Sequence, residues 1–238
     1  MPNPSISQRL HDRLVLIIAS TPPGERLPSE PALAQQLGVS RATLRESMRT
    51  FESQGLIRRR QGSGTFVTHP SAIIDTGLEV LESIETLADR INLPVTMGTW
   101  KIDLRPAKEE ECFALGIDAE CQVIQISRVI EAENRPVAYL IDILPSNILK
   151  PDEITRGFTG SVLDLLLQRG VPALAVSRTE ITAVTASPEL ARALGIQRGD
   201  VLLHFNAYLY SADGQVIDFS FSYFLPGYFR FHVIRRVG

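Results

Sequence analysis

The sequence has no apolar run that could cross a membrane and few residues of the kinds that build disulfide or metal frameworks. No stretch approaches the roughly 20 apolar residues of a membrane span, and residues 1–10 lack the charged and apolar segments of a signal peptide. Cys112 and Cys121 are the only cysteines. Two cysteines exclude a disulfide framework and favour buried free thiols, so we expect a cytoplasmic protein.

Metal and catalytic patterns are also missing. The four histidines, including His69, are scattered and have no acidic or cysteine partners at ligand spacing. No nucleophile–base pair and no glycine-rich phosphate loop is visible, so we expect no metal, no cofactor and no enzymatic activity.

Lysine is absent from the first 70 residues, where the positive charge is carried by arginine alone. This segment contains nine arginines and five acidic residues, a net charge of +4, whereas the remaining residues have a net charge of −7. We call residues 1–70 the basic head. A basic head followed by an acidic remainder suggests that the head binds a polyanion, although chance segregation of charge would look the same.

The basic head predicts three helices separated by short breaks. Residues 7–19 carry apolar side chains at three- and four-residue spacing. Ser29 is a plausible N-cap for a second helix that ends at Gly38, and Ser40 one for a third helix over 41–54. The turn 38–40 is so short that the second and third helices must cross steeply, as they do in a helix-turn-helix.

The third helix carries two stripes. Leu44, Met48 and Phe51 form an apolar face, and Arg41, Arg45 and Arg49 form a basic row at i, i+4 and i+8. The basic row could bind DNA phosphates and guanine edges, or it could be a solvated face that pairs with Glu46 and Glu52. A basic hairpin over 55–68 with the glycine-rich tip 61–64 follows directly and favours DNA. The order is that of a winged helix-turn-helix.

Five segments of the head together resemble the GntR family of bacterial regulators: 24–30, 33–34, 38–45, 55–57 and 62–67. The resemblance implies DNA contacts from the start of the third helix, from the start of the second helix and from the wing: Ser29, Ser40, Arg41, Thr43, Arg45, Arg49, Gly62 and Gly64. Pro31 stands where many members carry a basic residue, which removes one expected contact.

The rest of the chain predicts an α+β fold with a mostly antiparallel sheet. An amphipathic helix is expected over 76–91, so we divide the chain into a DNA-binding domain (1–69), a linker with that helix (70–94) and a sensor domain (95–238). The sequence of 114–117 recurs at 193–196, each time before a strand, a polar turn and a return strand. This indicates two related halves of one pseudo-symmetric sheet, or only recurrent helix-capping chemistry.

Behind a GntR head, residues 123–236 resemble the UTRA effector-binding domain of the HutC-type branch, which implies a chorismate-lyase-like fold with a ligand cleft. The resemblance makes Arg128, Ser161 and Asp218 effector-binding residues, and Tyr223 could line the same site. The alternatives are a strand-end salt bridge for Arg128, a plain N-cap for Ser161, an exposed strand charge for Asp218 and simple packing for Tyr223.

The candidate pocket departs from that of sugar-phosphate-binding members. Ile130 and Leu140 stand where such members carry an arginine and often an acid, and Leu163 replaces an aromatic residue. We therefore expect an effector less polar than a sugar phosphate, such as a carboxylate or an amine held by Arg128 or Asp218.

Together these features predict a transcriptional repressor that binds double-stranded DNA as a homodimer on a palindromic operator, under control of a small-molecule effector and without membrane contact. The alternatives are an enzyme on the lyase-like fold and an architectural DNA binder that needs no ligand.

Overall fold

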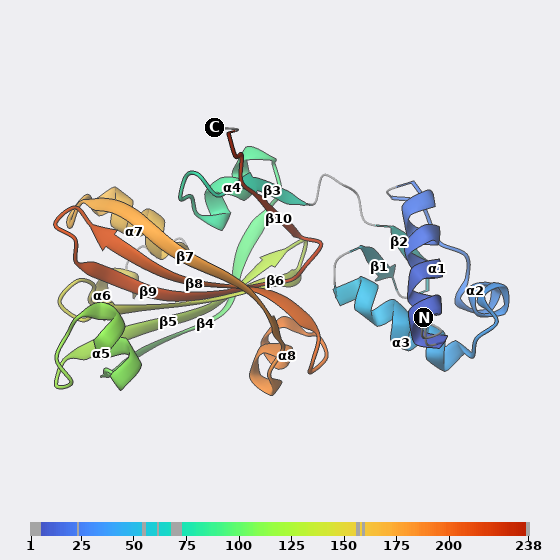
Figure 1. The fold of residues 1–238 in the computed structure, drawn as a ribbon, viewed down its shortest axis with the longest axis horizontal. Helices are drawn as coiled ribbons and strands as arrows, with labels where there is room; N and C mark the ends of the chain where they lie inside the picture. Colours follow the sequence, from blue (N-terminus) through green and yellow to red (C-terminus); the bar gives the residue numbers. More distant parts are fainter. Residues whose placement is uncertain are drawn as a thin grey trace. The chain divides into compact units, whose positions relative to one another are not determined.

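The computed structural model describes residues 6–22, 24–53, 56–60, 62–67, 73–155, 158 and 160–236. The chain forms two compact units, 1–73 with 225–230 and 74–224 with 231–238 (Figure 1). Gly55, His69 and Pro70, which the sequence marks as breaks, lie outside the described residues.

The first unit contains three helices and a hairpin. Its elements are α1 (Ile6–Ser20), α2 (Glu30–Leu37), α3 (Arg41–Ser53), β1 (Ile57–Arg60) and β2 (Gly64–Val67). Gly38 ends α2 in the left-handed conformation at φ +69°, which glycine adopts without a steric penalty. Apolar side chains from all three helices and both strands form one core around Leu14, Leu33 and Leu44, each of which is fully buried.

The hairpin is completed by a third short extended segment. β1 and β2 pair antiparallel from Ile57 opposite Val67 to Arg60 opposite Gly64. The amide of Leu27 donates to the carbonyl of Thr65 at 2.8 Å, and Glu25 accepts from the amide of Val67 at 2.9 Å. The chain before α2 therefore fixes the wing to the helices, and the predicted winged helix-turn-helix is confirmed.

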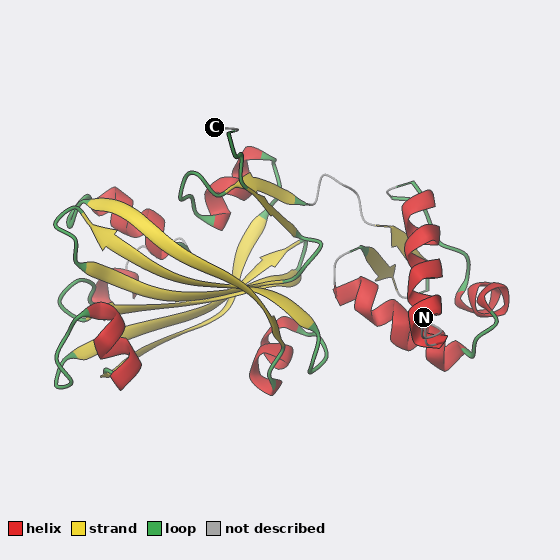
Figure 2. Cartoon of the chain, viewed as in Figure 1, coloured by secondary structure: helices red, strands yellow, loops and turns green. Residues whose placement is uncertain are grey.

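The second unit is built on one antiparallel sheet of six strands (Figure 2). The strand order is β4-β5-β6-β9-β8-β7. Their bounds are β4 Val95–Pro106, β5 Gln122–Ala132, β6 Arg135–Pro145, β7 Leu174–Thr185, β8 Val201–Ser211 and β9 Val216–Phe224. The predicted α+β class with a mostly antiparallel sheet is therefore confirmed.

The sheet has the internal symmetry that the repeated segments suggest. Strands β4, β5 and β6 occupy one half, and β7, β8 and β9 occupy the other half in mirrored order. The repeated residues end α5 (Glu109–Leu115) and α8 (Pro188–Leu194), and Gly116 and Gly195 cap them at nearly equal φ of +65° and +64°. Two equivalent strand–helix–strand–strand halves explain the repeat better than recurrent capping alone.

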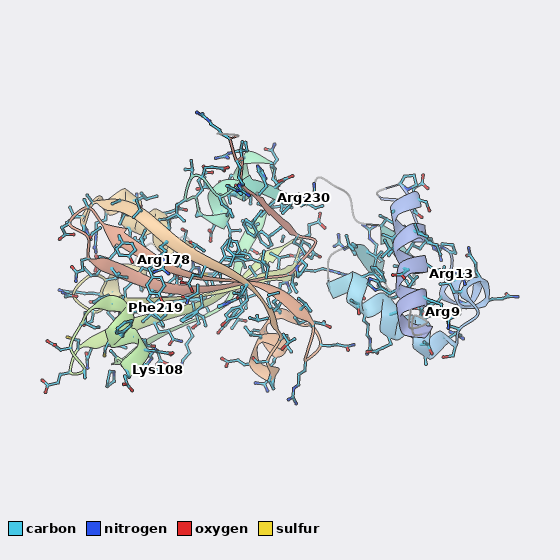
Figure 3. All side chains as sticks on the ribbon, viewed as in Figure 1. Arg9, Arg13, Lys108, Arg178, Phe219 and Arg230 are labelled. Atoms are coloured by element: carbon cyan, nitrogen blue, oxygen red, sulfur yellow. The ribbon has the colours of Figure 1, made fainter. Side chains whose placement is uncertain are left out.

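Helices cover both faces of this sheet. On one face, Leu115 of α5 packs against Val123, Ile143 and Phe219, and Figure 3 shows Phe219 beneath α5. On the other face, α6 (Pro151–Thr155) and α7 (Val162–Arg169) bury Ile154, Val162 and Leu166 against the strands. Alternate residues of each strand therefore face different layers, and this alternation decides which side chains can share a site.

The expected helix over 76–91 is wrong in its first half. Residues Ile74–Gly77 form β3, which pairs with β10 (Phe229–His232), and the helix α4 covers only Ile84–Arg90. The hydroxyl of Ser83 accepts from the amide of Thr86 at 3.0 Å and starts the helix there. Leu78 and Leu81 imitate an apolar stripe in the sequence but are exposed.

None of the helices in the described part of the chain is long and apolar enough to span a membrane. Cys112 and Cys121 are free thiols and half-buried, rather than fully buried as expected.

Candidate nucleic-acid interface and ligand cavity

The apolar stripe and the arginine row of α3 lie on different faces of the helix, as their spacing in the sequence predicts. Leu44, Met48 and Phe51 lie in the core and are at most 1% exposed. Arg41, Arg45 and Arg49 are exposed, and the side chains of Arg45 and Arg49 keep 53% and 58% of their surface in contact with solvent. The helix therefore presents a row of guanidinium groups outward.

Glu30, at the start of α2, organises part of this surface. Its Oε2 accepts from Nε of Arg45 at 2.7 Å, and its Oε1 lies 3.4 Å from Nη2 of Arg59 on β1. Glu30 thus ties α3 and the wing to α2, a role that sequence reasoning missed because 15 and 29 residues separate the partners. Arg49 pairs with Glu46 at 3.4 Å, as the solvated-face alternative expected.

The predicted hydroxyl contacts also lie on the surface. Ser40 caps α3 by accepting from the amide of Thr43 at 3.1 Å, and its hydroxyl lies 2.8 Å from that of Thr43. Ser29 stands at the N-cap of α2, but its side chain makes no capping hydrogen bond. Its hydroxyl and the positive end of α2 are therefore available to an anion.

The glycines of the wing tip differ in what they tolerate. Gly62 is exposed at φ +75°, with no atom within 4 Å of the position that a Cβ would occupy. Gly64 has φ +115°, and a Cβ there would lie 2.3 Å from Nε of Arg26. Gly64 is thus required by its backbone conformation and by the space that Arg26 occupies, whereas a Cβ at Gly62 would meet open space.

We expect Gly64→Ala to destabilise the wing by about 1–3 kcal/mol, because alanine cannot adopt this φ without strain and Arg26 must move. Gly62→Ala is the matched control and should cost about 1 kcal/mol. Thermal unfolding followed by circular dichroism and DNA binding followed by fluorescence anisotropy measure both variants. Equal losses in the two variants would contradict the requirement at Gly64.

The second unit contains a cavity of about 570 Å³. Its floor is the face of the sheet that carries Arg128 and Leu140, whose Cα atoms pair across β5 and β6, and Ser222 of β9, which pairs with Leu140. Its walls come from the segment 76–87 and from Ser161 and Leu163 at the start of α7. A cleft between the sheet and its covering segments was expected, and the structure has one.

Arg128 and Asp218, both predicted to bind an effector, lie on different strands and both line this cavity. Arg128 is 4% exposed, and its Nη1 donates to Oδ2 of Asp142. Its guanidinium carbon lies 5.9 Å from the ring centre of Phe158. Asp218 is 5% exposed, which excludes the alternative of an exposed strand charge. Arg128 does form a salt bridge, but in the buried middle of β5 rather than at a strand end.

Ser161 lies on the cavity wall and is also an N-cap. Its hydroxyl accepts from the amide of Asp164 at 3.0 Å, and the residue is 2% exposed. The carboxylate of Asp164 in turn accepts from the hydroxyl of Ser83 at 2.6 Å. This chain of hydrogen bonds links the start of α7 to the start of α4, and both Ser161 and Ser83 line the cavity.

Tyr223 lies on the other face of the sheet and does not line the cavity. Ser222 and Phe224 face the cavity, so the residue between them points away from it. Its ring stacks on that of His204 at 4.7 Å. The proposal that Tyr223 contacts an effector is therefore wrong, and its alternative role in packing is correct.

Burial changes the acidity of two carboxyl groups at the cavity. Burial raises the pKa of Asp218 well above its ordinary value, and the charge of Asp142 adds to this effect. Burial also raises the pKa of Glu85, partly opposed by the charge of Arg128. Both groups therefore hold a proton more readily than exposed carboxyls.

Sequence reasoning missed Glu85 and Asp142. The signal for Asp142 was available, because it follows Leu140 by two residues and therefore shares its face of β6. Glu85 had no such signal, since its position depends on where α4 packs. The described residues contain no group of three or more histidine, cysteine or acidic side chains placed to hold a metal ion.

Comparisons with known proteins agree with both units. Residues 5–67 match the bacterial regulatory proteins of the gntR family, and residues 93–230 match the UTRA domain. The histidine utilization repressor of Pseudomonas putida is 30% identical over 187 residues, which cover 77% of this chain and 73% of the relative. The transcriptional repressor NagR of Bacillus subtilis is 29% identical, with 82% and 79% covered.

Solved structures share the fold. PhnF from Mycobacterium smegmatis superposes with a TM-score of 0.65 at 22% identity, covering 96% of this chain and all of that one. The outward arginine row, the glycine-tipped wing and the cavity over the sheet thus occur in a chain whose two parts match two known domain families. The protein belongs to the GntR family, in its HutC-type branch with a UTRA domain, and is a ligand-responsive DNA-binding transcriptional regulator.

Proposed function

We propose that this regulator represses transcription as a homodimer bound to a palindromic operator. The observation that carries the proposal is the row Arg41, Arg45 and Arg49, which faces outward from α3 in the same unit as a glycine-tipped basic hairpin. Arg41 and Arg45 read guanine edges in the major groove, with Ser40 and Thr43 beside them, and Arg49 contacts the backbone. Ser29 holds a phosphate, and Gly62 and Gly64 let the wing approach the minor groove.

The cavity is the proposed effector site, with Arg128, Ser161 and Asp218 as ligand-binding residues and Asp142 and Glu85 beside them. Its wall includes residues 76–87, which follow the DNA-binding domain (1–69) within the proposed linker (70–94) and precede the sensor domain (95–238). A ligand that favours one arrangement of this wall shifts the population of operator-binding dimers by its difference in affinity for the two arrangements.

The chain regulates transcription in the cytoplasm by binding DNA. It binds and releases its ligand without changing it chemically. The relatives are named as repressors, which supports a regulator rather than an enzyme on a lyase-like fold. The cavity, with its buried charged groups, supports it over an architectural DNA binder that has no ligand.

Selection of short random duplexes by the full chain tests the proposal. We expect enrichment of one palindrome, binding by a particle of twice the chain mass of 26.3 kDa, and an affinity that falls steeply with salt because phosphate contacts release counterions. Enrichment of no sequence, or binding by a monomer to a single half-site, would contradict the homodimer on a palindrome.

A further inference from the structure

The charged side chains around the cavity are unbalanced in sign. Among the described residues that line it, one is basic and five are acidic: Arg128 against Glu79, Glu82, Glu85, Asp142 and Asp218. Glu79 accepts from the backbone amide of Ile234, and Glu82 pairs with Arg90. Three carboxyl groups therefore remain around a single guanidinium group.

That guanidinium group already has one ionic partner, bound through Nη1, although its Nε is buried without a hydrogen-bond partner. Arg128 pairs with Asp142, and the two residues are 4% and 8% exposed. Its charge neutralises one carboxylate, which leaves Glu85 and Asp218 without an ionic partner of their own among the described residues. A buried carboxyl group needs either a proton or a pairing cation, so a positive charge in the cavity would stabilise the ionised forms of Glu85 and Asp218.

Two buried oxygen atoms at the cavity show where that charge is missing. Oε1 of Glu85 and Oδ1 of Asp218 are inaccessible to solvent and have no hydrogen-bond partner in the described structure. Asp218 is 95% buried on the floor, and Glu85 lies on the wall. An unpaired buried polar atom destabilises the folded chain, and a hydrogen-bond donor on a ligand would remove that cost.

We propose that the effector of this regulator is an organic cation whose protonated amine donates to Asp218 and Glu85. This inference rests on the proposed effector site and narrows its ligand to one class. The apolar part of the ligand lies against Leu140 and Leu163 and against the rings of Phe205, Phe224 and Phe231, all of which line the cavity. Arg128 donates to Asp142 through Nη1 and keeps one buried, unpartnered donor at Nε, so an anionic ligand would find that single donor among surplus carboxyl groups.

Three compounds with one carbon skeleton separate these cases: 3-phenylpropylamine, 3-phenylpropan-1-ol and 3-phenylpropanoic acid. Calorimetric titration of the full chain without DNA measures binding directly, so its outcome is independent of repressor function. At neutral pH we expect the amine to bind at least about tenfold more tightly than the alcohol or the acid, the equivalent of about 1.4 kcal/mol.

The pH dependence provides a second readout. The groups that face Asp218 and Glu85 are Arg128 on β5, Asp142 on β6 and Asp164 on α7. A cation stabilises the ionised carboxyls, so its binding releases protons and its affinity should rise from about pH 5 to about pH 8. An anion would take up protons and show the opposite slope.

Variants assign the effect to these residues. Asp218→Asn and Glu85→Gln each keep size and polarity but remove the charge, and each should weaken amine binding about tenfold with little change for the alcohol. Asp213→Asn, at an exposed turn, is the matched control and should change nothing. Tighter binding of the acid, no amine binding at millimolar concentration, or an unchanged amine preference in both variants would each overturn the proposal.

Discussion

Replacing Arg45 by alanine is expected to weaken operator binding by about 1–3 kcal/mol and to relax sequence preference. The side chain projects from the exposed face of α3, and Glu30 holds its Nε at 2.7 Å while the rest of the guanidinium group remains half exposed. A group positioned in this way can donate two hydrogen bonds to one guanine edge. Anisotropy titrations with the selected palindrome and with a scrambled duplex measure the loss.

Two variants separate base reading from other effects of removing Arg45. Glu30→Gln removes the ion pairs with Arg45 and Arg59 but keeps the Arg45 guanidinium group, and surface ion pairs contribute about 0–1 kcal/mol each, so it should reduce affinity less than Arg45→Ala. Arg49→Ala should weaken binding to both duplexes alike and reduce the salt slope by about one. If Arg45→Ala also lowers both affinities equally, Arg45 contacts the phosphate backbone and does not read bases.

Arg128→Met is expected to destabilise the second unit by about 3–5 kcal/mol at neutral pH, because it leaves Asp142 buried without its cation and beside Asp218. Trp100, the only tryptophan, lies on β4 of this unit, so its fluorescence during urea unfolding reports on it. In the variant, these carboxyl groups would stay protonated in the folded protein at pH values where they have already ionised in the unfolded chain. Raising the pH from about 4 to about 7 should therefore widen the difference in stability from the unmodified protein.

A second substitution tests the cause. Arg128→Met combined with Asp142→Asn removes the stranded charge, so it should recover a large part of the lost stability and most of the added pH dependence. A double variant no more stable than the single one would show that Arg128 stabilises the unit by packing, for example against Phe158, rather than by charge.

The sequence was most informative where structure is local. Within α3 the arginines recur every four residues and the apolar residues every three or four, so the separation of the two stripes follows from helix geometry alone. The caps at Ser40 and Gly38 are equally local, and both were predicted correctly. The segment 76–91 failed because spacing cannot distinguish an apolar stripe that packs from one that remains exposed.

The candidate sites show the same division. Arg128, Ser161 and Asp218 were identified by resemblance and do border one cavity. Tyr223 was misplaced because its position in β9 turns it to the opposite face, and Asp142 was overlooked although it shares the face of Leu140. Both errors concern strand alternation: residues two apart in one strand share a face of the sheet, and residues one or five apart do not.

The amino-acid order alone indicated the two-part organisation, the winged helix-turn-helix, the antiparallel sheet class and the basic surface of α3, because helix spacing, caps, turns and hairpins are signals carried by residues close in the chain. Only the tertiary structure decided that Glu30 joins Arg45 to Arg59 and that Glu85, Asp142 and Asp218 gather around Arg128. Those partners are far apart in sequence and come together only when helices pack and strands pair. The balance of charge in the cavity, and with it the class of ligand, is therefore a property of the folded chain.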